Sequence, residues 1–232
     1  GEVGVRSARL LGDDAVLAAV LSVLAMGYSF TGQPADAERC FTEALEVWRR
    51  TGDRMGETVA LNGMAVNLYT QGRLEEAVGC QRAALTVLAG LGEQRSSSAG
   101  TALNNIAEML GSLNRHDEAL VCAEQPVAIY QEIGDPFAVS ITETTLAQTY
   151  LALGRHEDAA RHSQRALSAR HDTVGESASR ADALCCLASA MAASAVQGEA
   201  RDAWQAALPV LDRLGDPRAA GVRDELASIG AS

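Results

Sequence analysis

The chain has 232 residues, of which 47% are hydrophobic and 21% charged, a length that allows one or two globular domains with real cores. No apolar stretch approaches the roughly 18 residues of a membrane span, and no secretory leader opens the chain. The net charge of −11, with 19 basic residues that are all Arg, argues against a nucleic-acid backbone as a direct partner. The first residue is Gly rather than Met, which indicates an excised or processed piece.

A period of about 40 residues runs through the chain. Six glycines recur at nearly equal intervals, and each is followed at once by an acid: Gly12, Gly52, Gly92, Gly134, Gly175 and Gly215. A second turn signal comes about twenty residues later, at Gly32-Gln33, Gly72-Arg73, Asn114-Arg115, Gly154-Arg155 and Ala195-Val196. Gly suits the left-handed end of one helix and the acid suits the start of the next. Each period therefore predicts two helices of about 17 residues joined by tight turns.

Small residues recur in register within this period, as close helix crossings require. The first helices carry Ala25, Ala65, Ala107, Ala147 and Ala188, and the second helices carry Ala37, Ala77, Ala119, Ala159 and Ala200. These coincidences predict an all-α fold built from stacked antiparallel helix pairs.

The pattern resembles the tetratricopeptide repeat (TPR). Its first-helix signature is similar to residues 61–69 and to Leu103-Asn104-Asn105-Ile106-Ala107, and its second-helix signature to residues 72–78 and 154–160. The resemblance covers roughly residues 13–214 and implies a right-handed α-solenoid. One departure is length, because the usual repeat has about 34 residues. Lengthened repeats are typical of kinesin light chains and of the large bacterial regulators.

The period also sets the expected organisation of the chain, a single TPR array over residues 1–232. Residues 2–11 are expected to end a truncated preceding repeat, and 215–232 to form a C-terminal cap helix that begins near Pro217. The repeats between them are expected at 12–51, 52–91, 92–133, 134–174 and 175–214.

Motifs for catalysis or for cofactor and metal binding are lacking in the sequence. It has no phosphate-binding loop and no H-E-x-x-H metal motif. His116 and His156 share a register at second-helix starts, which favours a solvated position, and His162 does not share a helix face with His156; the fourth histidine is His171. We therefore expect no catalytic residues, no cofactor and no metal site, and no enzyme activity.

The five cysteines are interpreted as free thiols. Cys40, Cys80 and Cys122 share one register, about 10 Å apart from helix to helix, which is too far for a disulfide and favours buried apolar fillers. The adjacent Cys185 and Cys186 leave a strained disulfide or redox switch open as an alternative. Free thiols without an export signal favour a reducing cytoplasm.

The first-helix face that lines the concave side of such arrays is the candidate binding site. One register across the first helices gives small polar residues, the next turn adds a second row, and Asn105 and Tyr69 lie beside them. The expected contacts are Ser22, Met26, Asn62, Val66, Tyr69, Asn104, Asn105, Glu108, Thr144 and Gln148. Carboxamides can both donate to and accept from a peptide backbone, and in kinesin light chains the Leu-Asn-Asn motif holds peptides this way. The alternative is that these Asn side chains bridge neighbouring repeats and bind nothing. Glu108 would favour a basic ligand group.

The 40-residue Leu-Gly-Asp array, Arg-only and Ala-rich, resembles the C-terminal TPR domain of large actinobacterial SARP-type transcriptional regulators. In those antibiotic-biosynthesis regulators, DNA-binding and ATPase regions precede the repeats. The resemblance implies a sensor-regulatory domain whose partner is a peptide or protein segment, including other domains of the parent protein. The alternatives are the TPR domain of a LuxR-type ATP-dependent regulator, a quorum-sensing peptide receptor, and a plain protein–protein scaffold. We expect no direct contact with nucleic acid or membrane.

Overall fold

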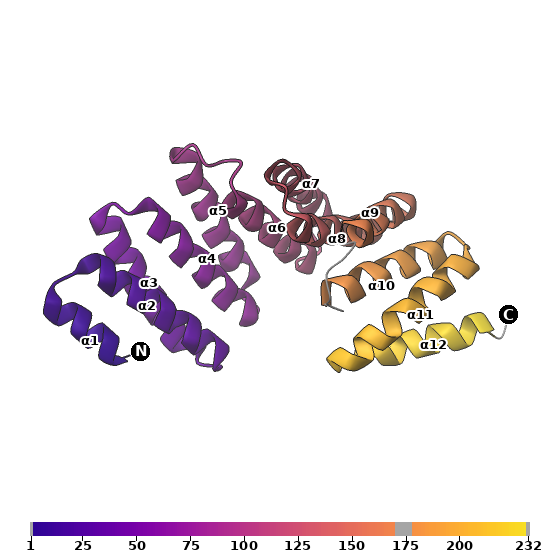
Figure 1. Cartoon of the computed structure of the whole chain (residues 1–232), viewed down its shortest axis with the longest axis horizontal. Coiled ribbons are helices and arrows are strands. Elements are labelled where there is room, and N and C mark those ends of the chain that lie inside the picture. The colour runs from indigo at the N-terminus through magenta and orange to yellow at the C-terminus, as the bar shows by residue number, and fades with distance from the viewer. Residues whose placement is uncertain (1, 170–177, 231–232) are drawn as a thin grey trace. The chain divides into compact units, whose positions relative to one another are not determined.

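Every regular element in the described part of the chain is an α-helix (Figure 1). The computed structural model describes residues 2–169 and 178–230. The helices are α1 (Glu2–Leu11), α2 (Asp14–Phe30), α3 (Pro34–Thr51), α4 (Arg54–Thr70), α5 (Leu74–Gly90), α6 (Ser97–Ser112), α7 (His116–Ile133), α8 (Pro136–Ala152), α9 (His156–Ser168), α10 (Ala178–Ala193), α11 (Gln197–Leu214) and α12 (Arg218–Gly230). The expected all-α architecture of antiparallel helix pairs is confirmed, with pairs such as α2 with α3 and α8 with α9 in close contact.

The chain divides into two compact units, residues 1–115 and 116–232, and each is described by itself. Unit 1 holds α1–α6 and unit 2 holds α7–α12. The division falls inside the expected third repeat, 92–133. The single array over residues 1–232 remains a prediction.

The periodic turns take the backbone conformation that the glycines predict. Gly12, Gly32, Gly52, Gly72, Gly92, Gly134, Gly154 and Gly215 all have φ between 65° and 77°, and at the two turns without Gly, Asn114 and Ala195 take φ of 59° and 61°. This left-handed region costs an ordinary side chain free energy but is open to Gly. Gly175 and the acid after it, Glu176, lie outside the described residues.

The acid after the turn glycine accepts a backbone hydrogen bond at the start of the next helix in four cases, one of them Asp216, which accepts from the N–H of Arg218 at 2.9 Å. The side chains of Asp13, Asp53 and Asp135 each accept a hydrogen bond from a backbone N–H in the first turn of the helix that follows. The third repeat differs, because Ser96 rather than Glu93 caps α6 and accepts from the N–H of Ala99 at 3.2 Å. The extra residues of this repeat thus move the start of α6 to a new cap.

The alanines in register are the closest points of the helix packing. Each of the ten is no more than 1% exposed: Ala25, Ala37, Ala65, Ala77, Ala107, Ala119, Ala147, Ala159, Ala188 and Ala200. Trp48 and Trp204 pack in the cores at 8% exposure. The ring of Phe41 lies so close to Gly63 that a methyl group on this glycine would come within 2.4 Å of the ring.

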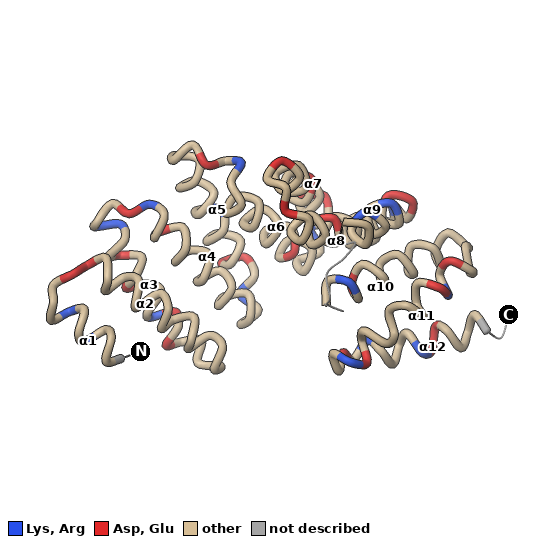
Figure 2. Tube along the Cα trace, viewed as in Figure 1, with Lys and Arg blue, Asp and Glu red and all other residues tan. Residues whose placement is uncertain are grey.

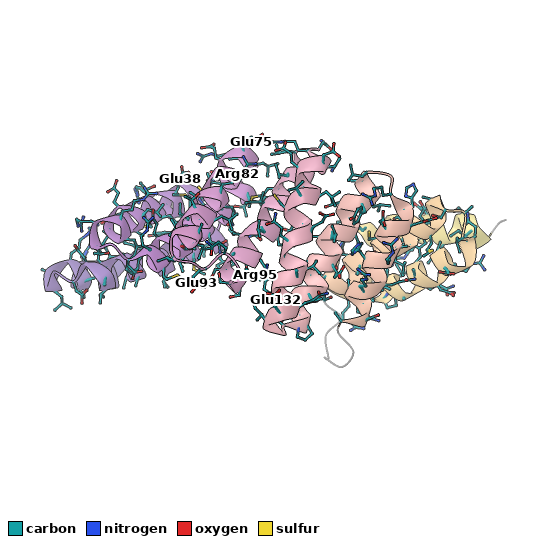
Figure 3. All side chains as sticks on the ribbon, turned by 90° about the horizontal axis from the view of Figure 1, so that it is seen from above. Glu38, Glu75, Arg82, Glu93, Arg95 and Glu132 are labelled. Atoms are coloured by element: carbon teal, nitrogen blue, oxygen red, sulfur yellow. The ribbon has the colours of Figure 1, made fainter. Side chains whose placement is uncertain are left out.

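Ion pairs link successive turns of unit 1. Arg73, at the second turn of its repeat, reaches back to Glu38 of α3 at 2.6 Å. Arg115 makes the equivalent reach to Glu75 of α5 at 3.0 Å. Glu38 and Glu75 appear on the same side of unit 1 in Figure 3. Exposed pairs of this kind each contribute only about 0–1 kcal/mol to stability.

The C-terminal helix α12 packs on α11, in the place expected for a cap. Arg218 pairs with Asp216 at 2.6 Å and with Asp182 of α10 at 2.7 Å, and Arg223 pairs with Asp212 of α11. Hydrogen bonds from Arg218 lower the pKa of Asp216 to about 2. The outward face of α12 is therefore charged and tied to the preceding helices, which suits a terminal helix.

Two expectations for individual side chains are corrected. Cys40 is buried, but Cys80 and Cys122 are only half-buried, because their shared register lies at the edge of the packed face. His116 and His156 are half-buried rather than solvated, and the Nδ1 atom of each is buried without a partner. All five cysteines are free.

Candidate functional site

The first helices of unit 1 carry very little charge compared with the second helices. Along α2 the only charged residue is Asp14, α4 has Arg54 and Glu57 in its first turn, and α6 has Glu108. In contrast, α3 carries four acids and three arginines, and Figure 2 colours acids red and arginines blue. The face made by α2, α4 and α6, here called the inner face of unit 1, is therefore suited to neutral ligands rather than to ionic ones.

Apolar side chains remain exposed on this inner face. Met26 and Val66 are each 45% exposed and Tyr69 is 41% exposed, although all three could have packed in a core. Nearer the start of α4, Met55 and Val59 are also exposed. Exposed apolar groups that gather on one face indicate an interaction surface.

A cluster of three carboxamides joins α4, α5 and α6. Asn62 Oδ1 accepts a hydrogen bond from Gln81 Nε2 at 2.8 Å and another from Asn105 Nδ2 at 3.3 Å. Asn62 and Asn105 are half-buried. Among the described residues no hydrogen bond occupies Asn62 Nδ2 or Asn105 Oδ1, and neither atom is sealed from solvent. The cluster thus presents one free donor and one free acceptor side by side.

Asn104 differs from its neighbour Asn105. It is 6% exposed, and its Nδ2 donates to Glu108 Oε1 at 2.8 Å on the same helix. Its Oδ1 is buried without a partner. Asn105 therefore joins α6 to α4 and stays partly exposed on the inner face. Asn104 instead holds the exposed carboxylate of Glu108 in place by a hydrogen bond.

Two of the expected contacts point inward instead. Ser22 and Thr144 are 6% and 5% exposed, and each hydroxyl donates at 2.8 Å to the carbonyl of the residue four positions earlier. A Ser or Thr in mid-helix satisfies its hydroxyl in this way when no other partner is near. Neither hydroxyl is offered to a ligand. Gln148 of α8 is exposed, in unit 2.

Sequence reasoning missed Gln81. It is fully buried in a second helix, whereas the expected contacts were all sought on first helices. The same position in other repeats carries residues such as Phe41 and Trp204. A carboxamide at a position that otherwise holds aromatic or small residues was the available signal.

A buried polar pair in unit 2 was missed as well. Glu143 of α8 is 1% exposed, and its Oε2 lies 2.5 Å from Nδ1 of His162 on α9, which is 9% exposed. The Tyr150 ring stacks on His162 with centroids 5.1 Å apart, and its hydroxyl donates to Glu124 Oε1 at 3.2 Å. The guanidinium of Arg155 lies over the Tyr150 ring, 4.5 Å from its centroid.

Chemistry beyond binding finds no support in these arrangements. In residues 2–169 and 178–230 no three His, Cys, Asp or Glu side chains come together as metal ligands would. His171 lies outside the described residues. No helix in the part of the chain that the structure describes is long and apolar enough to cross a membrane.

Residues 8–208, most of the chain, match the MalT-like TPR region. The chain belongs to this TPR family. Its TPR region is 27% identical over 195 residues to the regulatory protein AfsR of Streptomyces griseus. That match covers 84% of the chain but only 19% of AfsR, so the chain spans about a fifth of the length of this relative.

Two solved structures show the same TPR fold. BtubC from P. vanneervenii superposes with a TM-score of 0.81 at 21% identity, covering 92% of this chain and 89% of its own. A Signal Transduction ATPase with Numerous Domains (STAND) protein with a tetratricopeptide repeat sensor, from Pyrococcus horikoshii, gives a TM-score of 0.78 at 17% identity. There the match covers 94% of this chain and 33% of the larger protein.

Proposed function

We propose that this chain is the sensor-regulatory TPR domain of a multidomain, SARP-type transcriptional regulator linked to an ATPase, and that it works in the cytoplasm by binding a peptide or protein segment. The similarity to AfsR over a fifth of that protein supports the regulatory part of the proposal. The STAND protein, a signal-transduction ATPase with a TPR sensor, supports the link to an ATPase. The role is non-catalytic, as is usual for helical-repeat scaffolds.

The observation that carries the binding role is the free amide edge at Asn62 and Asn105. A peptide unit has one N–H and one C=O, which Asn105 Oδ1 and Asn62 Nδ2 can pair with in turn. Such contacts read the backbone of an extended segment and not its sequence. Val66 and Tyr69 lie on the same helix as Asn62 and offer apolar contact beside these bonds.

The inner face also fits a segment without strong charge. The first helices of unit 1 carry few ionic groups, so a highly charged segment would lose hydration and gain few ion pairs there. The exposed carboxylate of Glu108 is the exception and favours one basic group on the segment. An intramolecular segment of the parent protein has a further advantage, because tethering raises its effective concentration and lets a weak contact act as a restraint.

The test begins with the gene that encodes this chain. A phosphate-loop ATPase and a DNA-binding region encoded upstream of Gly1 are expected. That upstream region, produced separately, should bind the chain in a calorimetric titration, and Asn105→Ala should weaken the binding. No interaction with the upstream region, or the absence of an encoded ATPase, would contradict the proposal.

A further inference from the structure

A small pocket opens on the inner face of unit 1, between α4, α5 and α6. Its volume is about 170 Å³. Its lining includes the apolar side chains of Met55, Val59, Ala84 and Ala102 and the carboxamide residues Asn62 and Gln81. The pocket therefore adjoins the free amide edge that carries the proposed function.

Gln81 gives this pocket a buried hydrogen-bond acceptor that has no donor in the described part of the chain. The residue is fully buried, and its Nε2 is committed to Asn62 Oδ1 at 2.8 Å. Its Oε1 is buried as well and has no partner among the described residues. Because this bond holds Nε2, the amide group of Gln81 cannot rotate to find Oε1 another partner without breaking the bond to Asn62. A buried acceptor in this state calls for a donor.

The walls of the pocket restrict what that donor can belong to. None of the nine residues that line it is charged. An ammonium, guanidinium or carboxylate group that entered would lose its hydration without an opposite charge to meet. A purely apolar group would fill the space but leave the acceptor at Gln81 Oε1 without a hydrogen bond.

The pocket is smaller than those that hold drug-sized ligands. Pockets for drug-sized ligands usually have about 300–1,000 Å³, well above the volume here. One side chain of a bound segment fits better, because the free amide edge at Asn62 can hold the backbone while the side chain enters.

We propose that this pocket selects one neutral side chain with a hydrogen-bond donor at its tip, such as Gln, Asn or Thr, from an extended segment bound on the inner face. The proposal rests on the proposed function and adds sequence preference to it. The donor of the inserted side chain pairs with Gln81 Oε1, and its stem packs on Met55 and Val59.

Pools of acetylated and amidated pentapeptides test the proposal on the whole 232-residue chain. Each pool has one fixed central residue and mixed residues elsewhere, and retention on the immobilised chain is measured. Pools centred on Gln, Asn or Thr should be retained about two- to tenfold better than the Leu pool, which is the value of one neutral hydrogen bond. Pools centred on Glu or Lys should be retained less than the Gln pool.

Two variants identify the pocket as the source of this preference. Gln81→Leu removes the acceptor and should reverse the order of the Gln and Leu pools. Thr101→Phe, at an exposed position on the rim, should fill the mouth and abolish the preference, and it decides the matter if Gln81→Leu loses its helical content. Thr86→Phe makes the same change at an exposed position of α5 outside the pocket and should leave the preference intact.

The possible outcomes separate this proposal from the proposed function. If the chain retains peptides without a central preference, or if Thr101→Phe keeps the preference, the pocket proposal is wrong while backbone binding stands. If the chain retains no pool at all, peptide binding by the inner face is wrong and the pocket proposal is overturned with it.

Discussion

His162 and Glu143 meet at two positions where each of the first three repeats carries Cys and Leu. In the register of the 40-residue period, His162 replaces Cys40, Cys80 and Cys122, and Glu143 replaces Leu21, Leu61 and Leu103. The two substitutions come as a pair, and their side chains bond at 2.5 Å inside unit 2. A lone carboxylate or imidazole at either position would be a buried polar group without a partner.

This relationship predicts strong coupling between the two residues. Either Glu143→Leu or His162→Cys alone should destabilise the chain by about 1–3 kcal/mol, because the remaining polar partner stays buried without its hydrogen bond. The double variant restores the pattern of the other repeats and should lose far less stability. A double-mutant cycle from urea unfolding monitored by circular dichroism measures the coupling. Additive losses in the double variant would show that the pair is not an energetic unit.

The sequence predicted the turns and the close helix crossings well, and for a physical reason. Turns and close helix crossings are local demands that recur in every repeat, so the position of Gly52 or Ala65 in the period is enough to indicate its role. Glu143 and Gln81 break the repeat pattern instead. Their roles depend on partners from another helix, at positions where the other repeats carry mainly apolar residues. Side-chain orientation also determines which of the expected residues can reach a ligand. Ser22 shares the register of Asn62, but its hydroxyl hydrogen-bonds within its own helix.

A pair of helix glycines tests the packing of unit 1. A methyl group at Gly63 would lie 2.4 Å from the Phe41 ring, whereas one at Gly79 would meet open space. Gly63→Ala should therefore destabilise the chain by about 1–3 kcal/mol through overpacking. Gly79→Ala, the matched control in α5, should stabilise it by about 0.5–1 kcal/mol because Ala is the better helix former. Thermal unfolding of both variants measures the contrast, and equal melting temperatures would contradict the packing described for Phe41.

Burial should make the thiol of Cys185 slow to react near neutral pH. Burial raises the pKa of Cys185 to about 11, and burial also raises the pKa of Cys186. Since the thiolate is the nucleophile, Cys185 should alkylate slowly near neutral pH, and its rate should climb about tenfold per pH unit until the pH approaches 11. Iodoacetamide labelling followed by peptide mass spectrometry gives the rate at each cysteine. A rate for Cys185 that levels off near pH 8.5 would contradict the effect of burial.

The last prediction separates binding from architecture at the two adjacent asparagines. Asn105→Ala removes the free acceptor and the bond to Asn62, whereas Asn104→Ala removes only a bond within α6. With the Gln-centred peptide pool as probe, Asn105→Ala should weaken retention several-fold while helicity is kept, and the double variant with Asn104→Ala should lose about as much as Asn105→Ala alone. Asn104→Ala alone serves as the control and should retain the pool nearly as the original chain does.

The competing interpretation, that these side chains only bridge repeats, makes the opposite prediction for the same proteins. The single neutral bond from Asn105 to Asn62 is then worth about 0.5–1.5 kcal/mol of stability and nothing for binding. Melting curves and retention measured on Asn105→Ala therefore distinguish the two interpretations. A variant that melts earlier yet retains the pool at the original level would show that the carboxamide cluster is architectural, because the only bond lost is the one between α4 and α6.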